Sequence, residues 1–412
     1  MAASIVLLTG CGASGSAAAH SPSPSSVASA AATPSEVAAS RSPSPAIPSP
    51  SPIPSALPSP SPVPQVACHG GASSGAIVQL EGYQHELLYD VADPLHPRLL
   101  CSIANTSAHL FTGDTFEYLK PVSANQTDVM LHSFGSGNES HAGSFPFYMT
   151  SGAWLPDGSV AAFMTQIAPD NNNYPAGGWQ VWLYAQRRLA PLYAYLQGIG
   201  DCICRFGLPG QVLSISPDGQ YIVAGWIAGK GSEPLAVYRV SDRTRVATLD
   251  NSAYRAIWDR AGHRLFLSLF GTPAISWTPE AGTSSLTGAA VWSYVSNVSP
   301  DGSLVAYTAY ADPDSLKPRV YLYDLKAGTT RMLLDQPRSQ LLFVKDGWVW
   351  YLEEVPCTAN CAGSTQPSGK VFAMQLSSGV ENVVPFAAGD DPRSQAGLYG
   401  LIFDPGEFWP AS

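Results

Sequence analysis

The chain has 412 residues, of which 13% are charged and 10% aromatic, and its formal net charge is −10 at pH 7. This acidic balance argues against nucleic acid and against anionic lipid surfaces as partners. No apolar run approaches the roughly 20 residues of a membrane span. The aromatic-rich, charge-poor composition favours an exported protein.

The chain begins with a short apolar run, Ile5–Leu8, followed by Thr9, Gly10 and Cys11. This resembles the lipobox of bacterial lipoproteins, in which the cysteine becomes the lipidated N-terminus after cleavage. The resemblance implies a signal segment at 1–10 and a lipid on Cys11 that anchors the protein to the outer side of the bacterial cytoplasmic membrane. No Lys or Arg precedes Cys11 and the apolar run is short, so we expect the true translation start to lie upstream.

A tether is expected over residues 11–66. Thirteen prolines lie between Ser21 and Val66, and from Gly12 to Val66 the only charges are Glu36 and Arg41. Such a segment has too little apolar surface to offset its ordering entropy, so we expect it to be disordered. Its prolines bias it toward polyproline II, which would let it extend on the order of 100 Å.

Residues 67–412 contain a repeated turn motif. Close copies of Pro-Asp-Gly with apolar flanks lie in Trp154–Val160, Ile215–Tyr221 and Val298–Leu304. Looser or weaker copies are Trp258–Arg264, Phe343–Val349, Phe111–Gly113 and Phe403–Gly406. Each copy predicts a tight turn between two short strands, and a second hairpin follows. Four strands every 40–60 residues or so indicate a blade of a β-propeller.

The ring is expected to close by pairing of N- and C-terminal strands. The last copy lies almost at the C-terminus, so its blade lacks outer strands, and the hairpin formed by 86–90 and 98–103 can supply them. Seven copies predict an all-β protein with seven four-stranded blades, although six or eight stay possible because the outermost copies are weak. Closure would protect the sheet edges.

The Ser-Pro-Asp-Gly copies resemble the WD-like repeats of TolB-type bacterial β-propellers, and Asp90–Pro97 resembles a hairpin of related extracellular repeats. The similarity covers about residues 76–412. Such families include protein-binding envelope components, propeller caps on peptidases and domains of unknown role. The peptidases also carry an α/β-hydrolase domain, for which this chain has no room.

One face of the ring is expected to carry the long connections. Turns between first and second strands lie on one face, and connections from second to third strands and between blades lie on the other. The long segments assigned to that second face are Ser133–Ser144, Gln166–Gly178, Gln197–Gln211, Ile227–Pro234, Ala311–Pro318 and Leu352–Gly369. Aromatic and oxygen-rich groups there suit a sugar or a peptide. The candidate binding residues are Asp170, Tyr174, Trp226, Tyr310, Asp312, Asp314, Glu353 and Glu354. Packing in the blade core explains most of the aromatic residues equally well.

Motifs for catalysis or metal binding are weak. Gly71–Gly75 matches a nucleophile elbow, but a disordered tether precedes it and a strand-like segment follows. Glu353 and Glu354 are adjacent, so on a strand they point to opposite faces, which suits paired-carboxylate catalysis poorly. The histidines show no ligand spacing, and Asp170–Asn173 lacks a calcium pattern. We expect no catalytic residue, no metal and no cofactor.

The cysteines predict disulfide bonds. Seven cysteines less Cys11 leave an even number in an oxidising compartment. Cys357 and Cys361 lie close together in one long connection, and Cys68 can pair with Cys101 across the N-terminal hairpin. Cys202 and Cys204 are too close for an unstrained bridge, which leaves separate partners or a redox pair. The sequence does not decide the connectivity.

Together these features predict a monomeric surface lipoprotein whose propeller binds a protein, peptide or glycan of the envelope or its surroundings. The membrane would be contacted only through the anchor. An enzyme acting on an envelope polymer, or an envelope assembly factor, is the alternative. An enzyme would depend on single acidic residues, whereas a binding protein would depend on several loops.

Overall fold

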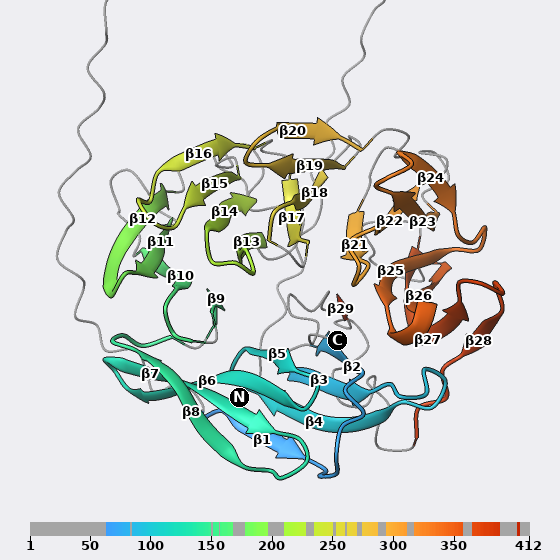
Figure 1. Ribbon diagram of the computed structural model, residues 1–412, viewed down its shortest axis with the longest axis horizontal. Helices are drawn as coiled ribbons and strands as arrows, with labels where there is room; N and C mark the ends of the chain where they lie inside the picture. Colours follow the sequence, from blue (N-terminus) through green and yellow to red (C-terminus); the bar gives the residue numbers. More distant parts are fainter. Residues whose placement is uncertain are drawn as a thin grey trace, which may run out of the picture. The chain divides into compact units, whose positions relative to one another are not determined.

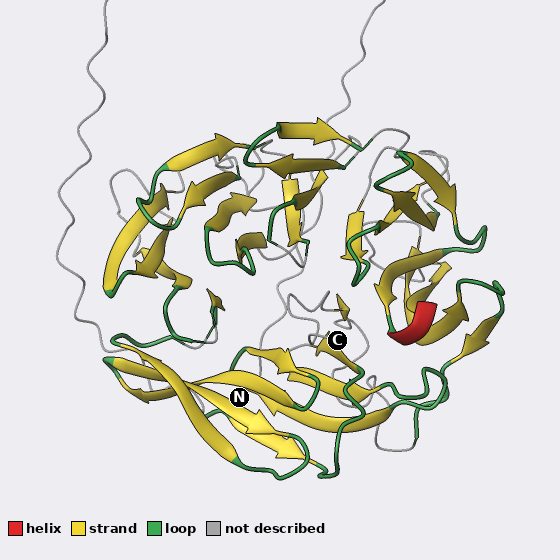
Figure 2. Ribbon diagram, viewed as in Figure 1, coloured by secondary structure: helices red, strands yellow, loops and turns green. Residues whose placement is uncertain are grey.

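The computed structural model describes a β-propeller (Figure 1). The residues described are 63–82, 85–149, 151–155, 157–167, 178–196, 210–227, 235–249, 253–259, 262–269, 274–286, 294–310, 317–356, 365–387 and 402–403. They form strands, turns and one short 3₁₀ turn, η1 (Lys345–Gly347) (Figure 2). No helix within these ranges is long and apolar enough to cross a membrane.

Seven antiparallel sheets surround a central axis, as the repeat predicts. Blade 1 consists of β5 (Ala108–Thr112), β6 (Thr115–Ser123), β7 (Gln126–Ser133) and β8 (Glu139–Phe145). Blade 2 consists of β9 (Ala153–Trp154), β10 (Ala161–Ile167), β11 (Gly178–Ala185) and β12 (Arg188–Leu196). Blade 3 consists of β13 (Gly210–Ile215), β14 (Tyr221–Ile227), β15 (Ala236–Arg239) and β16 (Arg245–Thr248).

The next three blades repeat this order from the innermost strand outward. Blade 4 consists of β17 (Ala253–Trp258), β18 (Leu265–Leu269), β19 (Ile275–Thr278) and β20 (Gly282–Ser285). Blade 5 consists of β21 (Tyr294–Val298), β22 (Leu304–Tyr310), β23 (Pro318–Asp324) and β24 (Thr329–Met332). Blade 6 consists of β25 (Arg338–Phe343), β26 (Trp348–Pro356), β27 (Thr365–Gln375) and β28 (Glu381–Val383).

Blade 7 joins the two ends of the chain. Its strand order is β29 (Ile402–Phe403), β2 (Ile77–Gly82), β3 (His85–Asp90), β4 (Arg98–Ala104) and β1 (Gln65–Cys68). The predicted hairpin is present as β3 and β4. Sequence reasoning did not find that β2 is the second strand, or that β1 adds a fifth strand at the outer edge. The repeat glycine Gly406 lies outside the described residues.

The Pro-Asp-Gly turns are stabilised by their own aspartates. In the turn between β21 and β22, the Asp301 carboxylate accepts hydrogen bonds from the backbone N–H of Ser303 and from the hydroxyl of Ser299. Gly302 has φ +69°, a conformation that favours glycine. These contacts lower the pKa of Asp301, the Ser299 bond most strongly. The aspartate and the glycine are therefore required by the turn itself.

Each joint between neighbouring blades encloses one apolar cluster. On β22, Val305 and Tyr307 pack toward blade 4, whereas Ala306 packs toward blade 6. Successive side chains of a strand point to opposite faces, so a strand between two neighbours must be apolar on both. This explains the continuous apolar strands in the sequence.

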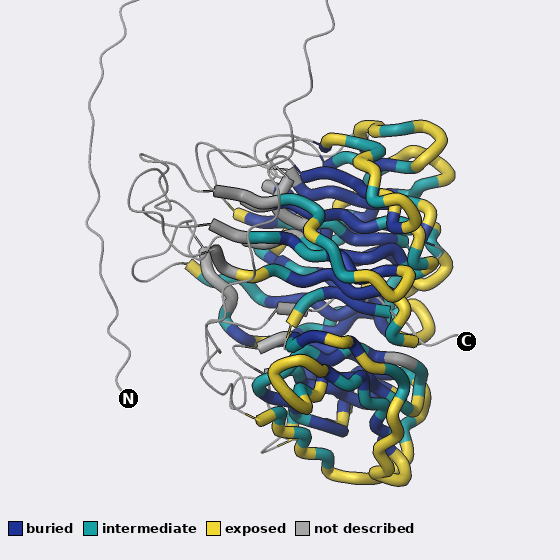
Figure 3. The backbone as a smooth tube through the Cα atoms, turned by 90° about the vertical axis from the view of Figure 1, so that its left-hand side faces the viewer, coloured by how far each residue is buried: buried dark blue, intermediate teal, exposed yellow. Residues whose placement is uncertain are grey.

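Alternating strand directions divide the connections between two faces. Turns joining first to second and third to fourth strands lie on the face that we call the turn face, where exposed residues gather at the right of Figure 3. The other connections belong to the opposite face, which we call the loop face. One prediction is wrong here: Ser133–Ser144 is not a loop-face connection, because it contains the 134–138 turn on the turn face and most of strand β8.

Candidate functional site

The loop face carries the longest intervals between strands. They span 168–177, 197–209, 228–235, 286–293, 357–364 and 384–401, whereas no described turn-face connection between paired strands exceeds seven residues; the turn-face segment from β1 to β2 has eight. Four of the five long second-to-third-strand segments predicted from the sequence belong to this face. Asp170, Tyr174, Cys357 and Cys361 fall in these intervals, and Asp312 and Asp314 fall between β22 and β23; all six lie outside the described residues, as does Cys11.

Three candidate positions lie at matching places in the fold. Trp226 is the penultimate residue of β14, Tyr310 is the last residue of β22, and Glu353–Glu354 lie in the final part of β26. All are at the loop-face end of a second strand. Only the backbone of Trp226 and Tyr310 is described, so their side-chain contacts stay predictions.

Glu353 and Glu354 contact different neighbouring strands of β26, whose pairing with β27 is irregular between Leu352 and Glu354. The Glu353 carboxylate accepts a hydrogen bond of 2.7 Å from the Ser368 hydroxyl and lies 3.5 Å from the Lys370 ammonium group. Glu354 instead accepts a 2.5 Å hydrogen bond from the Ser339 hydroxyl on β25. The two carboxylates therefore do not form a catalytic pair.

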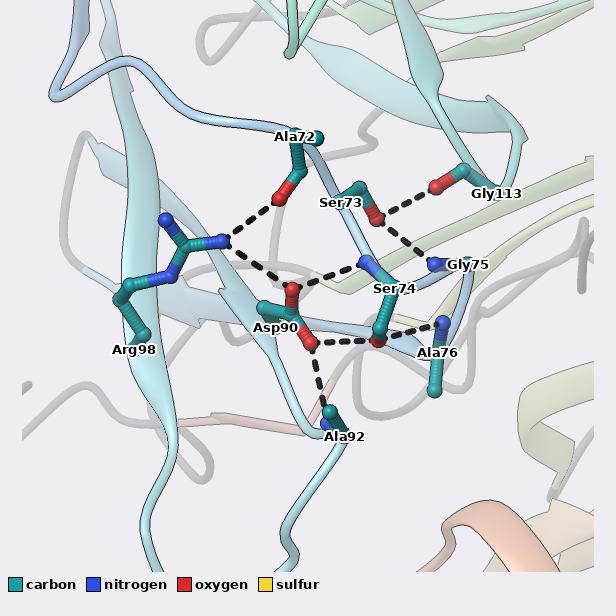
Figure 4. Close-up of polar contacts among 9 residues, drawn as sticks. All are labelled: Ala72, Ser73, Ser74, Gly75, Ala76, Asp90, Ala92, Arg98 and Gly113. Carbon is teal, nitrogen blue, oxygen red and sulfur yellow. Dashed lines mark hydrogen bonds and ion pairs between the residues drawn. The ribbon is translucent and has the colours of Figure 1, made fainter.

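The Gly71–Gly75 segment connects β1 to β2, and polar contacts hold it in place (Figure 4). The Ser73 hydroxyl donates to the carbonyl of Gly113 in blade 1 and accepts from the N–H of Gly75. Both partners of the Ser73 hydroxyl are backbone groups, and neither can act as a general base. Its bonds tie the segment to the neighbouring blade, which agrees with the rejection of the nucleophile elbow.

Asp90, at the end of β3, organises the same segment. Its carboxylate accepts hydrogen bonds from the N–H and hydroxyl of Ser74, from the N–H of Ala92 and from the Arg98 guanidinium, which also donates to the Ala72 carbonyl (Figure 4). Burial alone would raise the pKa of Asp90, but these bonds outweigh it and hold the pKa below its usual value. The cluster fixes the seam between blade 7 and blade 1.

Asp128, His141 and Ser144 form an exposed network on the outer strands of blade 1. The Ser144 hydroxyl donates to Asp128 at 2.7 Å and lies 2.8 Å from Nε2 of His141, which is itself 3.7 Å from Asp128. A catalytic triad needs the histidine between the serine and the acid. Here the serine is in the middle, so the network does not activate a nucleophile.

Glu117 is a buried acid at the joint between blades 1 and 2. Its side chain is fully buried, and neither carboxyl oxygen has a hydrogen-bond partner among the described residues. Desolvation is the main cause that raises the pKa of Glu117 to about 9, and the nearby charge of Asp157 adds to it, while the Trp154 indole opposes it. The Trp154 ring packs against His109, with ring centroids 4.2 Å apart and the ring planes tilted by 40°. Glu117 is therefore protonated at neutral pH.

His132 lies in a second buried polar cluster, at the joint between blades 7 and 1. The predicted Cys68–Cys101 disulfide is present and joins β1 to β4. Both sulfur atoms and one nitrogen of His132 lie within 4.8 Å of one another. Burial lowers the pKa of His132 more strongly than the Glu139 carboxylate raises it. Sequence reasoning missed this cluster because its members come from three strands of two blades and have no motif spacing.

Comparison with solved structures gives many matches, and those described here have low sequence identity. TolB from Acinetobacter baumannii is 15% identical, with a TM-score of 0.35, over 76% of this chain and 79% of that one. A Bacteroides uniformis protein provisionally assigned as a 6-phosphogluconolactonase is 12% identical, with a TM-score of 0.44, over 81% of this chain and 98% of that one. A prolyl endopeptidase is 12% identical, with a TM-score of 0.41, over 75% of this chain and 49% of that one.

Neither the scan against protein-family models nor the search of curated proteins finds a match. The fold of this chain is shown by its own sheet topology. The chain is a seven-bladed β-propeller with TolB-like structural neighbours.

Proposed function

We propose that this chain is a binding propeller displayed on the cell surface. A lipid on Cys11 and the 11–66 tether would hold the ring outside the membrane, and the loop face would bind a protein, peptide or glycan. The observation that carries the proposal is the unequal length of the connections on the two faces. A rigid scaffold with variable loops on one side is a common way to present a binding surface.

The described polar clusters support binding rather than catalysis. Asp90 and Asp301 accept hydrogen bonds from their own local segments. Glu353 and Glu354 contact different strands. Ser144 occupies the middle position of its triad-like network, where a histidine would be needed. The second-strand ends of blades 3, 5 and 6 place Trp226, Tyr310 and Glu353 at one face of the ring. Binding through several such loops fits the absence of a catalytic arrangement among the residues discussed.

The test is an envelope pull-down with the full chain. One variant has the 168–177 and 357–364 connections shortened, and the matched control is Lys326→Ala with Lys345→Ala, which alters exposed side chains on the turn face. Capture by the native chain and by the control, with loss in the shortened variant, supports the proposal. Equal capture by all three proteins, or capture by none, contradicts it.

A further inference from the structure

We propose that Cys68, Cys101 and His132 form a redox-gated metal site that binds Zn²⁺ or a similar thiophilic divalent cation when the disulfide is reduced. The inference does not depend on the proposed binding function of the loop face. The three residues lie at the joint between blades 7 and 1, on β1, β4 and β7.

The geometry fits a three-ligand set. Both Sγ atoms and one imidazole nitrogen lie within 4.8 Å of one another. With metal–ligand bonds of about 2.0–2.3 Å, the ligand atoms of a tetrahedral zinc site lie roughly 3.4–3.8 Å apart. Side-chain rotation about the Cα–Cβ bonds is enough to reach that separation once the S–S bond is broken.

His132 supplies the second, independent observation. The residue is 7% exposed, and neither ring nitrogen has a hydrogen-bond partner. Burial of a polar group without a hydrogen-bond partner is unfavourable. An imidazole directed at two sulfur atoms gains a partner when those atoms become thiolates that share a metal with it.

The carboxylate of Glu139 lies close to the His132 ring. Oε1 of Glu139 lies 3.8 Å from Nδ1 of His132 and accepts a hydrogen bond from the Tyr118 hydroxyl. Histidines that bind metals commonly donate their other ring N–H to a carboxylate, which orients the ring. The Glu139 side chain is 36% exposed, and Cys68 is partly exposed, so a cation has a route to the joint from its outer edge.

The redox step balances with a dithiol as reductant. Thiol–disulfide exchange breaks the Cys68–Cys101 bond through a mixed disulfide, and the two electrons come from the dithiol, which becomes a disulfide. After the exchange both cysteines are thiols. Metal binding then releases the two thiol protons. A disulfide reverses the exchange: it takes two electrons from the cysteine thiolates and two protons from solvent to become a dithiol, the Cys68–Cys101 bond re-forms and the cation is expelled. The metal is therefore held only in the reduced state.

The test uses the full chain with the other cysteines replaced, so that only Cys68 and Cys101 remain. The parent variant therefore carries Cys11→Ser, Cys202→Ser, Cys204→Ser, Cys357→Ser and Cys361→Ser. It is titrated with Co²⁺, whose thiolate complexes give a charge-transfer absorption, and with Zn²⁺ in competition. Two variants of this parent are compared: His132→Gln, and the control His141→Gln, which changes an exposed histidine on β8.

We expect the reduced parent to bind one Co²⁺ with a thiolate band and the oxidised parent to bind none. His132→Gln should weaken binding by at least about 100-fold, whereas His141→Gln should leave it unchanged. No thiolate band in the reduced parent, or equal affinity in the His132→Gln variant, would overturn the proposal.

A second measurement covers the case in which reduction loosens the ring. Zn²⁺ that binds only the folded protein raises its melting temperature. The reduced parent should gain thermal stability with Zn²⁺, and the reduced His132→Gln variant should gain none. Absence of any Zn²⁺ effect on the reduced parent would show that the cysteine pair is a structural disulfide only.

Discussion

The indole N–H of Trp350 donates a 3.0 Å hydrogen bond to the carbonyl oxygen of Pro94, which precedes it by 256 residues in the chain. Trp350 belongs to blade 6, and Pro94 belongs to the turn between β3 and β4 of blade 7. Both lie beside an apolar cluster that contains Leu80, Tyr89 and Val371. A side chain near the C-terminus thus satisfies a backbone group near the N-terminus, across the joint next to the closing blade.

Replacing Trp350 with phenylalanine should destabilise the ring by about 2–4 kcal/mol, because it removes buried volume and leaves the Pro94 carbonyl without its donor. Urea unfolding measures the change. Trp182→Phe is the control, since its indole donates to the Thr165 hydroxyl at an exposed position. An equal loss of unfolding free energy in the two variants would show that the buried hydrogen bond stabilises the ring no more than the exposed one.

Glu117→Gln should make stability less dependent on pH. The pKa of Glu117 is about 9 in the folded chain and 4.5 in the reference state, so the folded state holds the proton more tightly. Stability from this group is fully present below about pH 4.5 and falls as pH rises toward 9, by about 1.4 kcal/mol per pH unit. Urea unfolding at pH 5 and pH 8 should show a larger drop for the native chain than for the variant. Parallel losses in both proteins would contradict a protonated Glu117.

Glu381→Gln should destabilise the protein by about 3–5 kcal/mol, because it leaves a buried guanidinium without its charged partner. Arg338 is 7% exposed and donates to Glu381 at 2.8 Å, and the Tyr351 hydroxyl donates to the same carboxylate. The pair Arg319–Asp335, in which the aspartate is exposed, provides the control, and Asp335→Asn should cost at most about 1 kcal/mol. Thermal melts of the two variants at matched pH compare them directly, and similar melting temperatures would refute the difference.

Cys11→Ser should release the protein from membrane fractions while the propeller stays folded. The anchor is proposed to be the lipid on this cysteine, and the described ring begins far beyond it. Fractionation of cells that express the native chain, Cys11→Ser or the control Cys357→Ser tests this. Retention of the Cys11→Ser variant in the membrane fraction is the result that would refute the anchor.

The repeat was predictable because one local conformation recurs. Gly158, Gly219 and Gly302 all have positive φ in turns with an aspartate just before the glycine. The chemistry of such a turn is confined to a few adjacent residues, so the sequence displays it directly. The apolar strands beside the turns follow from burial on both faces, and they too are visible in the sequence.

Strand β8 was missed for the opposite reason. Most of Glu139–Phe145 is exposed or half-buried, since the outermost strand of a blade has no neighbour on one edge. Without apolar alternation, its Gly- and Ser-containing sequence resembles a loop. Strand β1 is short and equally weak in pattern, and its place beside β4 depends on tertiary pairing rather than on local preference.

The buried polar clusters could not be predicted from the sequence. Glu117 is next to Trp154 and His132 is next to Cys68 only because separate blades pack together. Strand geometry predicted that Glu353 and Glu354 would not form a carboxylate pair, whereas their partners on β27 and β25 depend on the assembled blade. Local geometry is therefore recoverable from this chain, whereas the contents of the joints depend on the assembled ring.

The Cys68–Cys101 bond also has a mechanical consequence. Strand β1 pairs with β4 over four residues, from the Gln65–Ala104 pair to the Cys68–Cys101 pair. The disulfide therefore lies at the C-terminal end of β1. Tension applied to the chain at Val63 would break the β1–β4 hydrogen bonds one after another. Separation of the two strands would then stop at the disulfide bond. The load would pass into β4, which β3 holds along its length. The disulfide thus gives the load a covalent path into β4 that does not pass through the pairing of β2 with β29, which closes the ring.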